Sequence, residues 1–315
     1  MDRLLQAEGK KLDVQKMIEE RKSKKSVGRL VEKVIPIFLL LCASVSVFTT
    51  AGILFTLLRE SIGFFSTVSL IDFYTGTNWS PWTDHFGVAP LIGGTLLITI
   101  VAAVVAVPIG LMSAIFLSEY AGSRTRRTIK PILEVLAGIP TVVYGFFALT
   151  FVTPILQSFI PDLGIFNALS AGIVVGVMII PMIASLSEDA MNSVPNSLRE
   201  GAYGLGSTKL EVVFKVVLPA ALSGIIASVV LAVSRAIGET MIVTIAAGAT
   251  PSLTMNPMES VQTMTAFIVQ AATGDTSFGS TIYYSLYAVG MTLFILTLAM
   301  NLLAQYISRK FREEY

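Results

Sequence analysis

The sequence predicts an all-α integral membrane protein with six transmembrane helices. Three observations support this fold class. Hydrophobic residues make up 54% and charged residues only 14% of the 315 residues, which is more apolar surface than one soluble core buries. Six apolar windows are long enough, at about 20 residues each, to cross the roughly 30 Å of bilayer hydrocarbon. Most of the basic residues fall in alternate segments between these windows.

The six windows set the expected order of the spans. They are predicted near residues 34–58, 90–117, 132–156, 165–187, 219–248 and 283–307. The second and fifth windows exceed the length of one crossing, so these helices are able to tilt, kink or extend beyond the membrane. Pro108, Pro140, Pro154 and Pro181 lie inside the second, third and fourth windows, where each removes a backbone donor and favours a kink.

The basic residues orient the chain. Of the 22 lysines and arginines, 20 lie before the first window, between windows two and three, between windows four and five, or after the last window. The positive-inside rule predicts that these segments are cytoplasmic, with both termini inside. Residues 1–27 are expected to form a cytoplasmic N-terminal extension, helical or loose, and residues 28–315 the transmembrane domain.

Composition and motifs exclude several classes of function. Cys42 is the only cysteine and His85 the only histidine, so we expect no disulfide and no metal site. The formal net charge of +1 gives no reason to expect nucleic-acid binding. No G-x-x-x-x-G-K-[ST] phosphate loop and no hydrolase motif is present, so no catalytic residue is predicted. A passive pore, an ion-coupled carrier and the membrane subunit of a pump driven by another protein remain.

The loop over residues 192–219, between windows four and five, is predicted to contain two short helices. An Asn or Ser cap at 192 or 193 is expected to begin the first helix, and Gly204 and Gly206 to end it. A T-x-x-E capping box at 208–211 is expected to begin a second helix that leads into the fifth span.

The first of these two helices carries an apolar stripe, although it has no membrane to enter. Val194, Leu198, Ala202 and Leu205 recur at spacings of four and three residues, which places them on one helical face. Either another protein covers this stripe, or it packs against the ends of the chain's own spans. The spacing leaves both alternatives open.

The same loop resembles a known motif. The stretch EGAYGLGSTKLEVVFKVVLP at 200–219 is similar to the cytoplasmic EAA loop of bacterial ABC-importer permeases, E-A-A, three residues, G, nine residues, I-x-L-P. The matching residues are Glu200, Ala202, Gly206, Leu218 and Pro219. Gly201 replaces the second-position alanine and Val216 the isoleucine. In that family the loop forms a coupling helix that docks into a groove on the ATPase subunit. The resemblance therefore implies that the ATPase is contacted by Leu198, Glu200, Gly201, Ala202, Leu205 and Gly206.

Three further segments resemble the phosphate-importer permeases of the PstC branch of that family. They are NWSPWTDHFGVAPLIGGTLLIT at 78–99, LAGIPTVVYGFFAL at 136–149 and SRAIGETMIVTIAAG at 234–248, and the resemblance covers roughly residues 28–310. Partner permeases of the PstA branch usually continue the G-E-T element with Ala-Pro, whereas Met241 and Ile242 follow it here. This difference favours the PstC branch over the PstA branch.

The resemblance implies a set of partners in a bacterial inner membrane. They are a PstA-like second permease that forms a heterodimer with this chain, two PstB-like ATPase subunits that bind ATP and Mg, and a PstS-like external phosphate-binding protein. Membrane lipid surrounds the spans. No cofactor is expected on this chain itself.

The fifth window contains two charges near its centre, Arg235 and Glu239. An arginine at mid-bilayer costs about 2.5–3.5 kcal/mol on insertion scales, so it should be paired or should face a water-filled path. The two residues would be about 40° apart around a continuous helix, on a face that Ser228 and Gly224 continue with side chains small enough to let a helix or a solute come close. One interpretation is an Arg235–Glu239 pair that only makes insertion tolerable.

The other interpretation, which the resemblance favours, places Arg235, Glu239 and Ser228 on the translocation path. Arg235 would donate charge-assisted hydrogen bonds to phosphate, while Glu239 holds Arg235 in position. The predicted function is therefore a permease subunit that moves inorganic phosphate inward by alternating access, driven by separate ATPase subunits.

Three alternatives are weighed against this function. A permease for molybdate, sulfate or phosphonate belongs to the same class. An ion-coupled secondary carrier belongs to another class and is expected to show internal inverted repeats, which we do not find in the sequence. A sensory scaffold for phosphate status is compatible with transport.

Overall fold

The protein is almost entirely helical over the residues that the computed structural model describes, 2–274 and 276–310. Within these ranges, side chains are described from residue 34 onward, except that of Ser308. The chain divides into two compact units, Met1–Thr56 and Leu57–Tyr315, and each unit is considered by itself.

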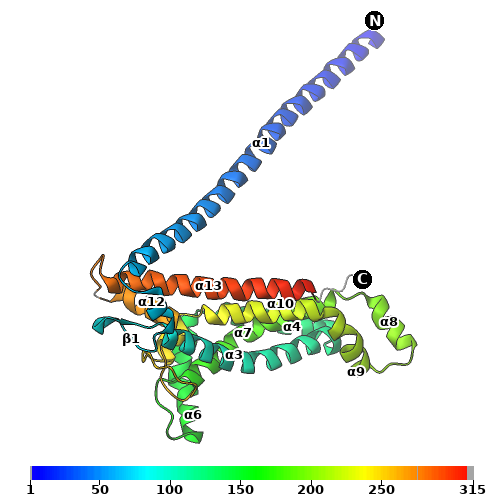
Figure 1. The fold of residues 1–315 in the computed structure, drawn as a ribbon. Coiled ribbons are helices and arrows are strands. Elements are labelled where there is room, and N and C mark those ends of the chain that lie inside the picture. The colour runs from blue at the N-terminus through cyan, green and yellow to red at the C-terminus, as the bar shows by residue number, and fades with distance from the viewer. Residues whose placement is uncertain (1, 275, 311–315) are drawn as a thin grey trace. The chain divides into compact units, whose positions relative to one another are not determined.

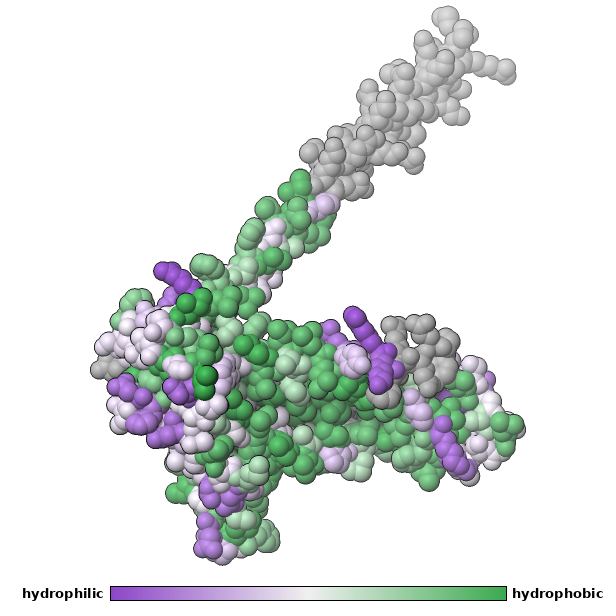
Figure 2. Space-filling model, in the orientation of Figure 1, coloured by the Kyte–Doolittle hydropathy of each residue, from purple (hydrophilic) through white to green (hydrophobic). Residues whose placement is uncertain are grey.

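The first unit consists of most of α1 (Asp2–Phe65), a helix of 64 residues. The helix passes residue 27 without interruption, so the backbone of the predicted extension and that of the first span are continuous. Val34–Phe65 is long and apolar enough to cross a membrane, and most of its apolar side chains are exposed (Figure 2). Such a surface is stable in lipid and costly in water. The domain boundary predicted after residue 27 stays a prediction.

The second unit holds five further candidate spans. These are α3 (Ala89–Ile115) continued by η2 (Phe116–Tyr120), α5 (Thr141–Phe147) continued by η3 (Ala148–Val152) and α6 (Thr153–Phe159), α7 (Ala168–Asn192), α9 (Lys209–Val212) continued by η4 (Val213–Val217) and α10 (Leu218–Ile237), and α13 (Thr281–Lys310). The shorter elements are α2 (Leu70–Thr75), β1 (Trp79–Ser80), η1 (Pro81–Thr83), β2 (His85–Phe86), α4 (Ser123–Ala137), α8 (Asn196–Gly204), α11 (Met241–Ala246) and α12 (Met264–Thr273). With Val34–Phe65, the described residues contain six candidate spans, the number predicted.

Helices α3, α7 and α10 pack together at the centre of the second unit (Figure 1). Gly176 brings α7 close to α3, because a Cβ at this position would lie 2.9 Å from the carbonyl oxygen of Ala102. Gly224 brings α10 close to α7, because a Cβ there would lie 2.5 Å from the Cβ of Ala190. The expectation that Gly224 lets another helix approach is confirmed, and the helix is α7.

The two ends of the second unit differ in chemistry. One end, called the basic end below, holds η2, α8, α9 and the end of α13, together with the lysines and arginines of residues 124–130, 199–215 and 309–310 (Figure 1). The opposite end holds the antiparallel pair β1 and β2, α2 and α12. Buried aromatic rings pack edge to face there, with Trp79 and Phe267 at 4.7 Å between centroids. These rings form a buried apolar cluster at that end of the unit.

Two of the predicted spans are interrupted: the third beside Pro140, where a kink was predicted, and the fifth, where the continuous helix assumed through Arg235 and Glu239 was wrong. In the third, α4 ends at Ala137 and α5 begins at Thr141. Pro140 lies in this gap, where it lacks a backbone donor and disfavours helical geometry for the residue before it. In the fifth, α10 ends at Ile237, well before the predicted end at 248, and α11 begins only at Met241.

Candidate translocation and coupling sites

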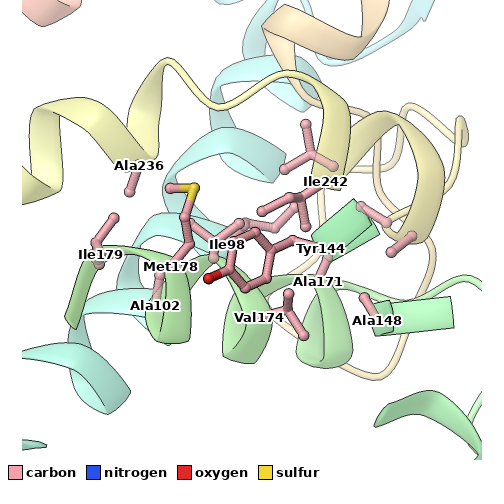
Figure 3. Packing of buried hydrophobic residues seen from close by; sticks show 14 of the residues in the cluster. Ile98, Ala102, Tyr144, Ala148, Ala171, Val174, Met178, Ile179, Ala236 and Ile242 are labelled. Carbon is pink, nitrogen blue, oxygen red and sulfur yellow. The ribbon is translucent and has the colours of Figure 1, made fainter. Parts of the chain in front are cut away.

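Arg235 lies in the last turn of α10, and its side chain is exposed. The adjacent face of α10 is fixed by the central core, in which Ala232 and Ala236 are fully buried. Figure 3 shows Ala236 beside Met178 of α7. Because the core holds this face, Arg235 is directed away from it. None of the ion pairs within 4.0 Å among the described residues involves Arg235.

Glu239 lies in the break between α10 and α11 and is buried. Its Oε1 accepts hydrogen bonds from the backbone N–H groups of Met241 at 3.1 Å and Ile242 at 3.2 Å. Its main-chain oxygen accepts a hydrogen bond from the hydroxyl of Thr265 at 2.7 Å. The carboxylate therefore satisfies donors in the first turn of α11, where a negative charge is favourable.

The predicted shared helical face of Arg235 and Glu239 was therefore wrong. The physical reason is that the helix ends at Ile237, between the two residues, so the 40° relation for a continuous helix does not apply. Both sides of the break still pack on one core, since Ala236 and Ile242 belong to the same buried cluster (Figure 3). Glu239 shapes the backbone beside Arg235 and forms no ion pair with its guanidinium.

Ser228 joins α10 to α7. Its buried hydroxyl lies 2.6 Å from that of Ser187 and donates to the carbonyl oxygen of Ile225 at 2.8 Å. Together with Gly224, one turn earlier, it allows the close approach of the two helices. The predicted place of Ser228 on a translocation path stays a prediction.

Helix α8 and the turn after it follow the predicted organisation of residues 192–219 except at the start. The predicted cap at 192 or 193 was wrong, because α7 continues to Asn192 and Pro195 is the N-cap of α8. Met191 at the end of α7 and Val194 just beyond it are buried in one cluster, so the chain packs on the spans up to the start of α8. Gly206 has a φ of +86°, a conformation suited to glycine, and α8 has ended before it as predicted.

The predicted capping box at the start of α9 is confirmed. The N–H of Thr208 donates to Oε2 of Glu211 at 3.0 Å, and the N–H of Glu211 donates to the Thr208 hydroxyl at 3.4 Å. These reciprocal bonds satisfy two backbone donors that a helix start leaves unpaired. Gly206 at its start and the Thr208–Glu211 capping box at its end therefore stabilise the turn between α8 and α9.

One part of the apolar stripe packs against the chain's own spans, and another part is exposed and free to contact another protein. Val194 is buried, and Leu198 and Ala202 pack on a cluster formed by the ends of α3, α7 and η4. Leu205 is 89% exposed, and Tyr203, two residues before it, is exposed as well. The chain itself therefore covers one part of the stripe, while Leu205 is left open to a partner. Glu200, Gly201 and Gly206 are exposed as well.

Arg199 fastens α8 to the rest of the basic end, which the sequence analysis missed. Its Nη2 donates to Oε1 of Glu119 at 3.0 Å and to the carbonyl oxygen of Met191 at 2.8 Å, and its Nη1 donates to that of Val194 at 2.6 Å. Only 13% of the Arg199 side chain and 6% of the Glu119 side chain are exposed. The available signal was that Glu119 is the only acidic residue between the second and third windows.

A second ionic cluster, also missed from the sequence, joins α4 to α7. The buried carboxylate of Glu188 contacts Arg126 Nε at 2.5 Å and Lys130 Nζ at 3.2 Å. Lys130 also donates to Asp189 at 2.9 Å, and this hydrogen bond raises the pKa of Lys130, so the ammonium stays protonated. The cluster clamps the basic half of α4 onto the end of α7.

The family follows from a direct match. The family model described as binding-protein-dependent transport system inner membrane component matches residues 106–313, more than half of the chain. The chain belongs to this family of importer permeases. The likeness predicted from the EAA-type loop is confirmed. A permease of this family is a multi-pass inner membrane protein that works with ATPase and substrate-binding protein partners.

Several curated relatives of this permease are similar over most of their length. The probable ABC transporter permease protein YqgH of Bacillus subtilis is 40% identical over 247 residues, covering 77% of this chain and 79% of the relative. The phosphate transport system permease protein PstC of Mesorhizobium japonicum is 34% identical, and the match covers 75% of this chain and 77% of the relative. The PstC protein of Haemophilus influenzae is 33% identical, and the match covers 81% of this chain and 84% of the relative.

Solved permease structures show the same fold. A bacterial ABC transporter for the import of the acidic polysaccharide alginate matches with a TM-score of 0.60 at 17% identity, covering 90% of this chain and all of the other. The MetNI methionine ABC transporter, in an inward-facing conformation, matches with a TM-score of 0.54 at 18% identity, covering 75% of this chain and all of the other. The predicted type I ABC-importer permease architecture is confirmed.

Proposed function

We propose that this permease moves inorganic phosphate into the cell. The observation that carries the proposal is the exposed guanidinium of Arg235, which has no carboxylate within 4.0 Å among the described residues. A membrane-embedded arginine without an ionic partner is costly unless it faces water or an anion. The relatives named PstC support phosphate as that anion.

Arg235 supplies the contact with the travelling ion. A guanidinium donates two parallel hydrogen bonds to a tetrahedral oxyanion, and these bonds are stronger than neutral ones. A single arginine holds the ion weakly enough to release it, as conduction requires. Glu239 acts as a positioning residue, because its bonds to α11 fix the backbone break beside Arg235.

Coupling to ATP hydrolysis takes place at the basic end, which we assign to the cytoplasm with both termini by the positive-inside rule. In this proposal the exposed residues Glu200 and Gly201 of α8, together with Leu205 and Gly206 directly after it, form the surface that docks on an ATPase. Leu198 and Ala202 pack α8 on the permease from the other side, so a movement of the ATPase is transmitted to the spans.

The proposed complex contains a PstA-like second permease, two PstB-like ATPase subunits that bind ATP and Mg, and a PstS-like external binding protein. ATP-driven closure of the ATPase pair alternates access to Arg235 between the two sides. A permease for molybdate, sulfate or phosphonate is the main competing function, because one arginine recognises any tetrahedral oxyanion. The ion-coupled carrier is disfavoured by the family to which the chain belongs.

The experiment is reconstitution of the complex with its ATPase in liposomes supplied with the external binding protein. We expect phosphate to stimulate ATP hydrolysis, and sulfate and molybdate to leave it at the basal rate. Stimulation by sulfate or molybdate instead of phosphate would reassign the cargo. Uptake driven by an ion gradient without ATP would refute the proposed coupling.

A further inference from the structure

A cavity of about 620 Å³ lies at the basic end, between the end of η2 and one face of α4. Its polar lining consists of Ser118, Ser123, Arg126, Arg127, Lys130 and Glu134. Apart from the adjacent Arg126 and Arg127, successive α4 residues in this set are three or four positions apart, so the set lies along one side of the helix. Neither Arg235 nor the exposed surface of α8 lines this cavity, so it is separate from the two sites described above.

Two of the three cationic side chains that line the cavity, Arg126 and Lys130, are held by ion pairs with α7. Glu188 and Asp189 of α7 form ion pairs with Arg126 and Lys130. These two side chains nevertheless remain 38% and 28% exposed. Their positions are therefore fixed by α7 while part of each side chain stays accessible to a ligand in the cavity.

The third cation, Arg127, differs from the other two. It is exposed, and no carboxylate lies within 4.0 Å of it among the described residues. Glu134 is the one carboxylate among the described lining residues, and it lies seven residues beyond Arg127, about 10 Å along the helix axis. The positive charge of Arg127 is therefore not neutralised by this carboxylate.

The combination of donors defines the class of ligand. A guanidinium offers paired N–H donors, an ammonium offers a compact positive charge, and serine hydroxyls offer further donors at the cavity wall. This set matches a phosphate group, which presents several acceptor oxygens and a negative charge.

We propose that this cavity binds a phosphate group, carried either by an anionic lipid or by free inorganic phosphate. A lipid phosphodiester and inorganic phosphate present the same oxygens to Arg127, so the chemistry of the cavity is shared. The exposed apolar side chains of Ile132 and Val135, further along α4, provide a surface for an acyl chain in the lipid case. The inference does not rest on the proposed cargo of the permease.

Arg127→Gln tests the proposal, with Arg124→Gln as the matched control. Arg124 lies on the same helix, is exposed and has no ion pair among the described residues, but it does not line the cavity. Each substitution removes one positive charge. The permease complex is purified with each variant, and equal elution volumes establish that both are folded.

Two measurements distinguish the sources of the phosphate group. Native mass spectrometry records phosphatidylglycerol retained from nanodiscs of phosphatidylglycerol and phosphatidylcholine, and equilibrium dialysis of the delipidated complex records radiolabelled inorganic phosphate. We expect Arg127→Gln to lower at least one of the two about tenfold, the effect of one lost charge-assisted contact, and Arg124→Gln to change neither by more than about twofold.

The outcomes separate cleanly. Loss of retained phosphatidylglycerol supports the lipid, loss of bound phosphate supports the free ion, and loss of both supports a cavity that accepts either. Unchanged binding of both ligands in Arg127→Gln would overturn the proposal. Equal losses in Arg127→Gln and Arg124→Gln would also overturn it, because they would show a general effect of surface charge.

Discussion

Replacement of Arg199 by methionine should loosen the attachment of α8 to the spans. The substitution removes the ion pair with Glu119 and the hydrogen bonds to the carbonyl oxygens of Met191 and Val194. It also leaves the Glu119 carboxylate, 6% exposed, without its partner. Removing one member of a buried ion pair costs about 3–5 kcal/mol. Because water reaches 13% of the Arg199 side chain, we expect the lower end, about 3 kcal/mol.

The control for this prediction is Lys215→Met, which makes the same change in charge nearby. Lys215 pairs with Glu211 at 3.1 Å, but the two side chains are 73% and 43% exposed. An exposed pair of this kind contributes little to stability, because water and salt screen it. We therefore expect a large fall in the apparent unfolding temperature of the purified complex for Arg199→Met and almost none for Lys215→Met.

A second substitution identifies the cause of the loss. Glu119→Gln in the Arg199→Met background removes the unpaired charge, so the double variant should recover part of the lost stability. Transport-linked ATP hydrolysis should fall in Arg199→Met, because α8 transmits movement less directly. Equal unfolding temperatures for Arg199→Met and Lys215→Met would refute the argument that burial of the pair gives Arg199 its importance.

Three further substitutions test separate parts of the structure. Glu239→Ala should cost about 1 kcal/mol by removing the acceptor for the N–H groups of Met241 and Ile242, whereas Glu239→Gln retains an acceptor oxygen and should cost less; equal unfolding temperatures for the two variants would contradict this role of Glu239. Gly224→Ala should cost about 1–3 kcal/mol by forcing a Cβ against Ala190, and Ala190→Gly should restore the unfolding temperature; a stable single variant would show that α10 and α7 are not in tight contact. Leu205→Glu should leave the permease stable and lower its copurification with the ATPase; undiminished copurification would exclude Leu205 from the docking surface.

The number of spans was predictable because the length and the hydropathy of each apolar window can be read directly from the sequence. Continuity of the spans was not, as the fifth window shows. The residues on both sides of Gly238 are apolar enough to suggest one helix, yet the helix breaks there and the Glu239 carboxylate accepts hydrogen bonds from the first two N–H groups of the helix that follows. Hydropathy records which residues prefer lipid, whereas the break depends on which backbone donors a single carboxylate reaches.

The spacing of residues in the sequence predicted the faces and caps within the α8–α9 segment better than it predicted contacts between helices. It placed Leu198, Ala202 and Leu205 on one stripe and found the T-x-x-E box, because both depend on local helical geometry. It did not show that Leu205 alone would stay open, since that depends on where the ends of other helices lie. The ionic contacts of Arg199 and Glu188 join residues far apart in the chain, which periodicity does not connect.

The most direct test of the account is phosphate uptake by membrane vesicles that contain the intact complex with Arg235→Gln. Arg59→Gln is the matched control, since Arg59 and Arg235 are the two basic residues outside the basic segments of the sequence. We predict that Arg235→Gln lowers the uptake rate at least tenfold while the ATPase stays bound, because hydrogen bonds to a charged group contribute about 1.5–3 kcal/mol. Arg59→Gln should transport normally. Uptake at the normal rate by Arg235→Gln would contradict the claim that phosphate passes this guanidinium.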